Sequence, residues 1–205
     1  MPLALCAGAI FFDVLAVLIV WPELDVFAGG YLALVTLLAF QQALFVKRLS
    51  PSPEVRRIFY SQHLDKTWDY TVPALGFAEL LVFYDYGHLH LLPELRLVPV
   101  QAAGLILLAL TIVWLFHVDA YLQKHFAPDK LLTGGPYRIN RHPRYLGLIA
   151  TRLSGPLILA SPFAWAIFAV WLYLVHRRVR LEEAYLRRTL GSAYDQYAAR
   201  TPGLY

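Results

Sequence analysis

Long apolar runs restrict the folds open to this chain more than any other feature of its sequence. They cover residues 3–20, 27–46, 98–118 and 145–175, and a weaker run lies at 71–84. About 20 apolar residues in a helix are enough to cross the hydrocarbon layer of a membrane. The sequence therefore predicts an all-α, polytopic membrane protein with about four spans. A carboxyl-terminal helical hairpin and a cytosolic tail helix are expected to follow them.

Composition favours a membrane protein over an unusually apolar soluble one. Only 16% of the 205 residues are charged, whereas soluble domains carry roughly 25%. The single cysteine, Cys6, excludes an internal disulfide and a cysteine-rich metal site. The histidines do not gather into a metal-binding pattern, so no metal is expected. Because no basic segment precedes the first apolar run, we expect that run to be a helix of the protein rather than a cleaved signal peptide.

The last apolar run predicts two helices. Residues 145–175 are long for one tilted span, and a Gly-Pro pair at 155–156 and a Ser-Pro pair at 161–162 divide them. Because proline lacks the N–H that continues a helix, we expect a tight helical hairpin with its break near 160–162. The polar residues 177–205 are expected to form a largely helical tail.

Positive charge gathers in three segments of the chain. Residues 47–70, 124–144 and 177–205 contain sixteen of the eighteen Lys and Arg residues. Basic loops tend to stay on the cytosolic side of a membrane. The predicted spans place all three segments on that side, so both termini are expected in the cytosol. We interpret the chain, residues 1–205, as a single membrane-embedded domain, with amino-terminal spans in 1–123 and the loop, hairpin and tail in 124–205.

Residues 133–147 form the most polar, glycine-marked and basic stretch of the chain. Two glycines and two prolines break regular structure on either side of Tyr137 and Arg138. Three arginines and a histidine crowd into the seven residues 138–144. This composition does not suit a packed core, and a long apolar run follows directly. The segment therefore predicts a cationic loop at the mouth of a membrane helix.

The loop and the tail together carry a recognisable set of motifs. They are Gly-Pro-Tyr-Arg at 135–138, Arg-His-Pro-Arg-Tyr-Leu-Gly at 141–147, Glu182-Glu183 with Leu186, and Gly191, Tyr194 and Tyr197. Over about residues 130–200, their order and spacing resemble the isoprenylcysteine carboxyl methyltransferase and phospholipid methyltransferase superfamily. The amino-terminal half is similar only in general character. The resemblance implies an integral membrane methyltransferase that binds S-adenosylmethionine without a Rossmann fold.

The resemblance also implies where the cofactor binds, between the loop and the tail helix. It assigns cofactor contacts to Tyr137, His142, Tyr145, Leu146, Gly147, Glu182 and Glu183. The residue types suit this ligand on chemical grounds. Carboxylates accept hydrogen bonds from ribose or ammonium groups, Arg138 or Arg141 can pair with the cofactor's carboxylate, and a tyrosine ring can face adenine or the sulfonium.

Methyl transfer is an in-line displacement that needs no metal and no covalent enzyme intermediate. A carboxylate acceptor needs no base, whereas an amine acceptor must lose a proton to a group such as Glu183 or His142. The candidate catalytic residues are Arg141, Glu183 and Arg152. Arg152 lies inside a predicted span, where a charge is costly and marks a candidate site. It is expected either to contact an anionic acceptor or to pair with Glu79.

Simpler interpretations of the same residues stay open. The arginines at 141 and 144 also fit a role as cytosolic anchors of the span. His142, which precedes Pro143, also fits a role as a helix cap. Glu182 and Glu183 also fit a solvated helix face that pairs with Arg187.

The sequence thus predicts methyl transfer to a lipophilic acceptor at the membrane–cytosol interface. The acceptor is expected to be an isoprenylcysteine-type carboxylate, a phospholipid amine or a small hydrophobic thiol. The alternatives are an NADPH-dependent membrane reductase of the sterol reductase type and a non-catalytic accessory protein. The basic residues lie at membrane ends, so a nucleic-acid partner is not expected. The expected location is the inner membrane of a bacterium or archaeon, and the sequence does not set the oligomeric state.

Overall fold

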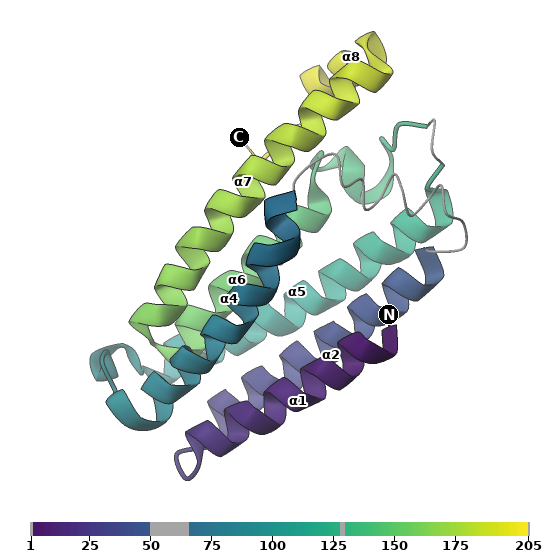
Figure 1. The fold of residues 1–205 in the computed structure, drawn as a ribbon. Coiled ribbons are helices and arrows are strands. Elements are labelled where there is room, and N and C mark those ends of the chain that lie inside the picture. The colour runs from purple at the N-terminus through teal and green to yellow at the C-terminus, as the bar shows by residue number, and fades with distance from the viewer. Residues whose placement is uncertain (1, 50–65, 128–129, 205) are drawn as a thin grey trace.

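The computed structural model describes residues 2–49, 66–127 and 130–204, and the described residues contain helices but no strand (Figure 1). The prediction of an all-α protein is confirmed. The α-helices are α1 (Pro2–Val20), α2 (Val26–Leu49), α4 (Lys66–Tyr84), α5 (Val98–His125), α6 (Pro143–Leu159), α7 (Pro162–Leu190) and α8 (Ser192–Arg200). The central part of the basic segment 47–70 lies outside the described residues.

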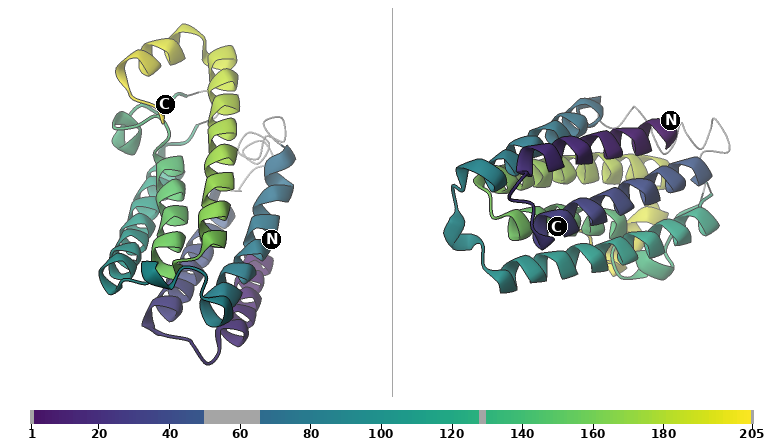
Figure 2. Two further views of the ribbon diagram at one scale, coloured as in Figure 1. Left: turned by 90° about the vertical axis from the view of Figure 1, so that its left-hand side faces the viewer. Right: turned by 90° about the horizontal axis from the view of Figure 1, so that it is seen from below.

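The long helices form a bundle whose two ends differ in character. α6 packs against α5 and α7, α2 lies against α1 and α5, and α4 lies against α7 and α1 (Figures 1 and 2). The carboxyl ends of α2, α5 and α7 lie at the same end of the bundle as the amino ends of α4 and α6 (Figure 1). The basic loop, α8 and the tail therefore meet at one end.

The break between α6 and α7 falls where the sequence predicts it. α6 ends at Leu159, Ala160 adopts a left-handed conformation with φ of 46°, and α7 begins at Pro162. The Ser161 side chain accepts a hydrogen bond of 3.3 Å from the Phe163 N–H, and proline suits the first helical position because it needs no N–H there. The hairpin prediction is confirmed.

The outer surface of the bundle is apolar. Large side chains such as Phe11, Phe77 and Val113 are more than 60% exposed. A soluble protein rarely exposes so much apolar surface, whereas lipid covers it without cost. α2 over Val26–Phe45 and α5 over Val98–His125 are long and apolar enough to cross a membrane, while the apolar stretch described in α1, Cys6–Val20, is shorter. The chain is a membrane protein, and its number of spans stays a prediction.

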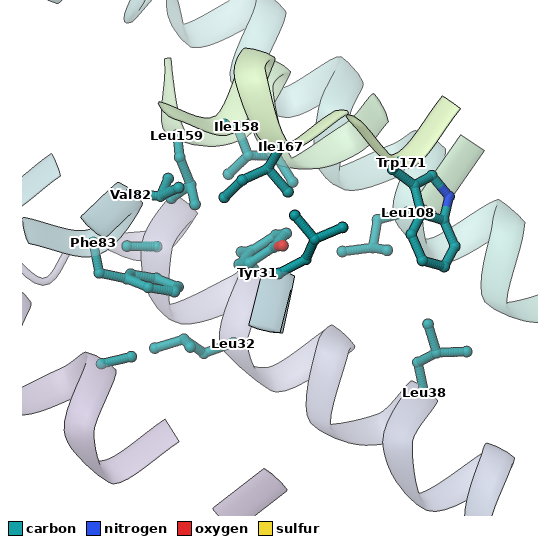
Figure 3. Packing of buried hydrophobic residues seen from close by; sticks show 14 of the residues in the cluster. Tyr31, Leu32, Leu38, Val82, Phe83, Leu108, Ile158, Leu159, Ile167 and Trp171 are labelled. Atoms are coloured by element: carbon teal, nitrogen blue, oxygen red, sulfur yellow. The ribbon is translucent and has the colours of Figure 1, made fainter. Parts of the chain in front are cut away.

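The core lies between α2, α4, α5, α6 and α7. Tyr31, Leu108, Ile158 and Trp171 pack there from four of these helices (Figure 3). α5 and α6 approach closely at Gly104, where a Cβ would lie 2.7 Å from the Ile158 side chain. This close approach packs α6, the helix that follows the basic loop, directly against α5.

Polar contacts close the end of the bundle opposite the loop. The Tyr86 hydroxyl donates to Asp25 at 2.7 Å, and Arg96 donates to the Tyr86 carbonyl at 2.7 Å. The buried Gln101 amide of α5 donates to the Ile158 carbonyl of α6 at 2.8 Å. These contacts hold the helix ends together far from the basic segments.

Candidate functional site

The basic loop is held in shape by its glycines. A 3-10 helix spans Gly135–Arg138, and Gly135 has a φ of +55°. The left-handed region is open to glycine at little cost. Side chains are also excluded here because a Cβ at Gly135 would run into the Tyr121 ring of α5. The loop therefore lies tightly against the end of α5.

His142 and Arg141 meet Glu183 of α7. His142 Nε2 and Arg141 Nη2 each lie 3.0 Å from Glu183 Oε1. The three side chains are only 2%, 11% and 14% exposed, respectively. An ionised carboxylate only accepts hydrogen bonds, so Nε2 of His142 carries a proton. His142 stands at the cap position of α6 without making a side-chain cap bond, so the helix-cap interpretation is wrong.

Glu183 stays ionised despite its partial burial. Burial alone would raise the pKa of the Glu183 carboxyl, but the hydrogen bond from His142 and the charges of Arg141, His142 and Arg187 outweigh that effect. The pKa therefore lies below its ordinary value. Arg187, one turn farther along α7, lies 3.6 Å from the second carboxylate oxygen, as the sequence led us to expect.

Two tyrosines lie beside Glu182 in the same region. The Tyr145 hydroxyl makes side-chain hydrogen bonds to Glu182 and Arg178. Burial, and next the negative charge of Glu182, raise the pKa of the Tyr137 hydroxyl above its ordinary value. The rings of His142 and Tyr145 have centroids 6.0 Å apart, so they lie side by side at the start of α6. The loop, the first turn of α6 and the Glu pair of α7 thus form one cluster.

The tail closes over the loop from the other side. The Tyr197 hydroxyl of α8 donates to the Tyr137 carbonyl at 2.6 Å. Beyond α8, the Pro202 carbonyl accepts from the Arg141 N–H at 2.9 Å and the Gly203 carbonyl accepts from Asn140 at 3.0 Å. Three chain segments therefore build the site.

Two buried donors in this cluster are left over for a ligand. Arg141 Nε and the Tyr194 hydroxyl have no hydrogen-bond partner among the described residues. Burial, and next the nearby charge of Glu183, raise the pKa of Tyr194 to about 12, so its hydroxyl remains a donor. Buried polar groups are normally satisfied. Their spare capacity fits a ligand with anionic or hydrogen-bond-accepting groups.

Three of the predicted site residues lie apart from this cluster. The Leu146 side chain is 43% exposed. Gly147 faces α5, where a Cβ would lie 2.7 Å from Leu115, so its small size serves helix packing. Arg152 pairs with Glu79 of α4, one of the two arrangements expected for it, and its guanidinium lies 5.2 Å from the Trp171 ring centre.

Arg144 has a different role from the membrane anchor that the sequence suggested. Its Nε lies 3.0 Å from Asp119 of α5, whose side chain is 3% exposed. It also donates to Gln42 of α2. The sequence offered one sign of this pair, because Asp119 is a charged residue at the end of a predicted span. Its partner is set by helix packing, which the sequence does not reveal.

Comparisons with known proteins agree with the motif analysis. Residues 98–193 match the model of the phospholipid methyltransferase family. A protein-S-isoprenylcysteine O-methyltransferase B of Arabidopsis thaliana is 37% identical over 75 residues, 36% of this chain and 38% of the relative. A protein-S-isoprenylcysteine O-methyltransferase of Schizosaccharomyces pombe is 33% identical over 73 residues, 35% of this chain and 31% of the relative. No solved structure matches the chain.

The matches cover only part of this chain and part of each relative. The matched part of the chain spans less than two fifths of each curated relative's length. These relatives come from a plant and a yeast, and they give no support to the bacterial or archaeal origin expected from the sequence. The family match contains the basic loop, α6 and the Glu pair of α7. Over this part of the chain, both comparisons support a relation to the isoprenylcysteine carboxyl methyltransferase and phospholipid methyltransferase superfamily.

Proposed function

We propose that this protein transfers a methyl group from S-adenosylmethionine to a lipophilic acceptor at the membrane–cytosol interface. The observation that carries the proposal is the contact of His142 and Arg141 with Glu183. This contact joins the basic loop to α7 inside the segment that matches the phospholipid methyltransferase family. The curated relatives are named O-methyltransferases, and the proposal extends that chemistry to this chain.

The residues around the contact suit the polar groups of S-adenosylmethionine. Arg141 has a buried Nε to spare and offers a planar donor edge to a carboxylate. Glu182 and the second oxygen of Glu183 are acceptors for an ammonium group or ribose hydroxyls. The rings of Tyr137 and Tyr145 suit adenine or the sulfonium. His142 completes the proposed set, and Leu146 and Gly147 would contribute backbone atoms.

The chain's proposed part in the reaction is to hold two reactants in line. The cofactor supplies a methyl group on a positively charged sulfur. Alignment in a site that excludes water supplies up to about 7–11 kcal/mol of the barrier reduction. Glu183 fixes His142 and Arg141. For an amine acceptor, His142 or Glu183 would take the proton, whereas a carboxylate acceptor needs no base.

The acceptor is proposed to reach this site from the bilayer along α6. Candidate acceptors are a prenylated cysteine carboxylate, a phospholipid amine and a small hydrophobic thiol. Arg152 lies seven residues beyond Tyr145, about two helical turns, and lines a small pocket with Glu79 and Tyr31. We assign Arg152 a role in contacting the acceptor. Its pairing with Glu79 favours an acceptor whose polar group is neutral at that depth.

The topology that fits this proposal places the site end of the bundle in the cytosol. The ends of α2, α5 and α7 that adjoin the basic segments lie together there (Figure 1). Both termini would then be cytosolic, with one membrane-embedded domain over residues 1–205. A cytosolic mouth gives the water-soluble cofactor access, while the acceptor remains in the lipid.

Methyl incorporation tests the proposed function. Purified protein in detergent is incubated with methyl-labelled S-adenosylmethionine and a lipid extract. We expect label in an apolar product with the wild type and with the control Glu94→Ala, which changes an exposed residue at the opposite end. Glu183→Ala should lose at least about tenfold in rate, because each 1.4 kcal/mol of lost alignment is tenfold.

Other outcomes point to the alternatives. Nicotinamide binding with oxidation of NADPH would favour the membrane reductase. No labelled product, together with no binding of either cofactor, would favour an accessory protein and would overturn the proposal.

A further inference from the structure

The half of the chain outside the family match is tied to α6 by buried polar contacts. The match begins at residue 98. Gln42 of α2 reaches Arg144 in the first turn of α6, and Glu79 of α4 reaches Arg152 in its middle. Apolar packing alone would allow α6 to slide or rotate slightly, whereas directional polar contacts do not.

The first of these contacts is a closed ring of three side chains, which we call the Gln42 ring: Gln42, Asp119 and Arg144. Gln42 Nε2 donates to Asp119 Oδ2 at 3.0 Å, and Arg144 Nε donates to Asp119 Oδ1 at 3.0 Å. Arg144 also donates to the Gln42 side-chain oxygen. The ring joins α2, α5 and α6, and both oxygens of the buried Asp119 are satisfied. A hydrogen-bond network centred on a buried carboxylate stiffens the elements that carry it.

The Gln42 ring lies next to the candidate site in sequence and in space. Arg144 is two residues after His142 and directly before Tyr145. The residue between His142 and Arg144 is also held, because the Trp114 indole of α5 donates to the Pro143 carbonyl at 2.9 Å. The charges of Arg144 and Asp119 both act on the Tyr137 hydroxyl. The first turn of α6 is thus fixed on the side away from Glu183.

We propose that Gln42 is a positioning residue for the candidate site, acting through the Gln42 ring. The ring sets the rotation and height of the first turn of α6, so that His142 meets Glu183 and Tyr145 meets Glu182. Its effect on ligand binding rests on the proposed function, whereas its effect on the His142–Glu183 contact does not. The amino-terminal half of the chain thereby contributes to the site without contacting the ligand.

The test compares two glutamines that each bond to another helix, the partly buried Gln42 and the buried Gln101. Gln42→Met keeps the side-chain length and removes the two hydrogen bonds that Gln42 makes, while the bond from Arg144 to Asp119 stays possible. Gln101→Met is the matched control, since Gln101 is 3% exposed and bonds α5 to the Ile158 carbonyl of α6 at the far end of the bundle. Both variants should lower the thermal midpoint. Only Gln42→Met should disturb the site.

Two independent measurements report on the site, one on the His142 side chain and one on ligand binding. The first is the ¹⁵N resonance of the His142 ring, assigned by its disappearance in His142→Gln; it should shift in Gln42→Met and stay in place in Gln101→Met. The second is the dissociation constant for S-adenosylhomocysteine from calorimetry. We expect it to rise about tenfold in Gln42→Met, equivalent to about 1.4 kcal/mol, and to change less than about twofold in Gln101→Met.

Arg144→Lys keeps the positive charge but cannot reach Asp119 and Gln42 together. It should therefore shift the His142 resonance and the dissociation constant less than Gln42→Met does. It decides the question if Gln42→Met does not fold. A lower thermal midpoint with an unchanged His142 resonance and unchanged affinity would overturn the proposal. Equal changes in the Gln42 and Gln101 variants would also overturn it, since they would show general loosening. If the wild type does not bind S-adenosylhomocysteine, the proposed function fails, and the His142 resonance alone decides the role of Gln42.

Discussion

At the scale of single residues, Glu183 connects the basic loop to α7. One of its oxygens accepts a hydrogen bond from His142 and forms an ion pair with Arg141. Two charged or polar groups therefore lose their partner if this carboxylate is removed. Leaving such donors buried without an acceptor costs more than the hydrogen bonds contribute on balance.

The Glu183 carboxylate should make the stability of the protein depend on pH. Its pKa in the folded protein lies below the ordinary value of 4.5, because three positive neighbours outweigh the effect of burial. Its contribution is therefore complete above the unfolded pKa and is lost as the pH falls through the folded pKa. The thermal midpoint of the wild type should exceed that of Glu183→Gln at neutral pH. The gap should close as the pH falls from 4.5 through the lower pKa of the folded protein. A gap that does not depend on pH would contradict this account.

Gly147 should tolerate no side chain, although it lies in a helix. A Cβ there would lie 2.7 Å from Leu115 and 2.9 Å from Trp114, and neither can move easily because Leu115 is fully buried and the Trp114 indole is hydrogen-bonded. We expect Gly147→Ala to cost about 1–3 kcal/mol through overpacking. Gly76→Ala in α4 is the control, because a Cβ there meets nothing within 4 Å. Thermal unfolding of both variants measures the difference, and equal midpoints would contradict the packing role.

Much of the residue-level site could be predicted from the sequence. The motif spacing brought together His142, Arg141 and Glu183, and the structure places them in contact. The part that could not be predicted depends on packing between distant helices. Arg144 reads as a membrane anchor in sequence, yet it pairs with Asp119, which lies twenty-five residues earlier in the chain. No local pattern encodes that pairing.

At the scale of elements, α8 and the residues after it act as a clasp on the loop. Tyr197 of α8 bonds the Tyr137 carbonyl, and the backbone at 202–203 bonds Asn140 and Arg141. A Cβ at Gly203 would run into the Arg141 guanidinium, so the tail lies directly against that side chain. The clasp holds the loop against α7.

Removing the clasp should abolish ligand binding while the long helices stay folded. A chain ending at Leu190 loses every contact of the tail with the loop. We expect circular dichroism to show that the helix content of the bundle is kept, and calorimetry to show no binding of S-adenosylhomocysteine. Tyr197→Phe is the mild comparison, because it removes one hydrogen bond and should cost about 1 kcal/mol. Full binding by the shortened chain would mean that the loop and α7 suffice.

The element boundaries were largely accessible from apolar periodicity and proline positions. The α6–α7 break was expected, and the structure confirms it. The number of spans was less accessible, because α4, α6 and α7 mix apolar residues with charged ones such as Glu79, Arg152 and Arg178. Such charges lower hydropathy without moving the helix out of the bundle.

At the scale of the whole molecule, the two ends of the bundle have different tasks. One end carries the loop, the Glu pair and the clasp. The other is closed by Asp25, Tyr86, Arg96 and Gln101, which bond helix ends to one another. Exposed apolar side chains cover the length between them. The site end is thus free to accept a ligand while the opposite end provides stability.

This division predicts which end faces the cytosol. After Cys6→Ser, cysteines introduced as Ser192→Cys and Glu94→Cys mark the two ends of the bundle. A thiol reagent that cannot cross the membrane, added to intact cells, should label Glu94→Cys and not Ser192→Cys. After the cells are opened, both should react. Labelling of Ser192→Cys from outside would reverse the proposed topology.

The central claim is that the basic loop and the Glu pair of α7 together form one binding site for the methyl donor. Calorimetric titration of the purified protein in detergent with S-adenosylhomocysteine tests it most directly. The account predicts one saturable site in the wild type, and at least about tenfold weaker binding in both His142→Ala and Glu183→Ala. Unaltered affinity in either variant, or no binding by the folded wild type, would contradict it.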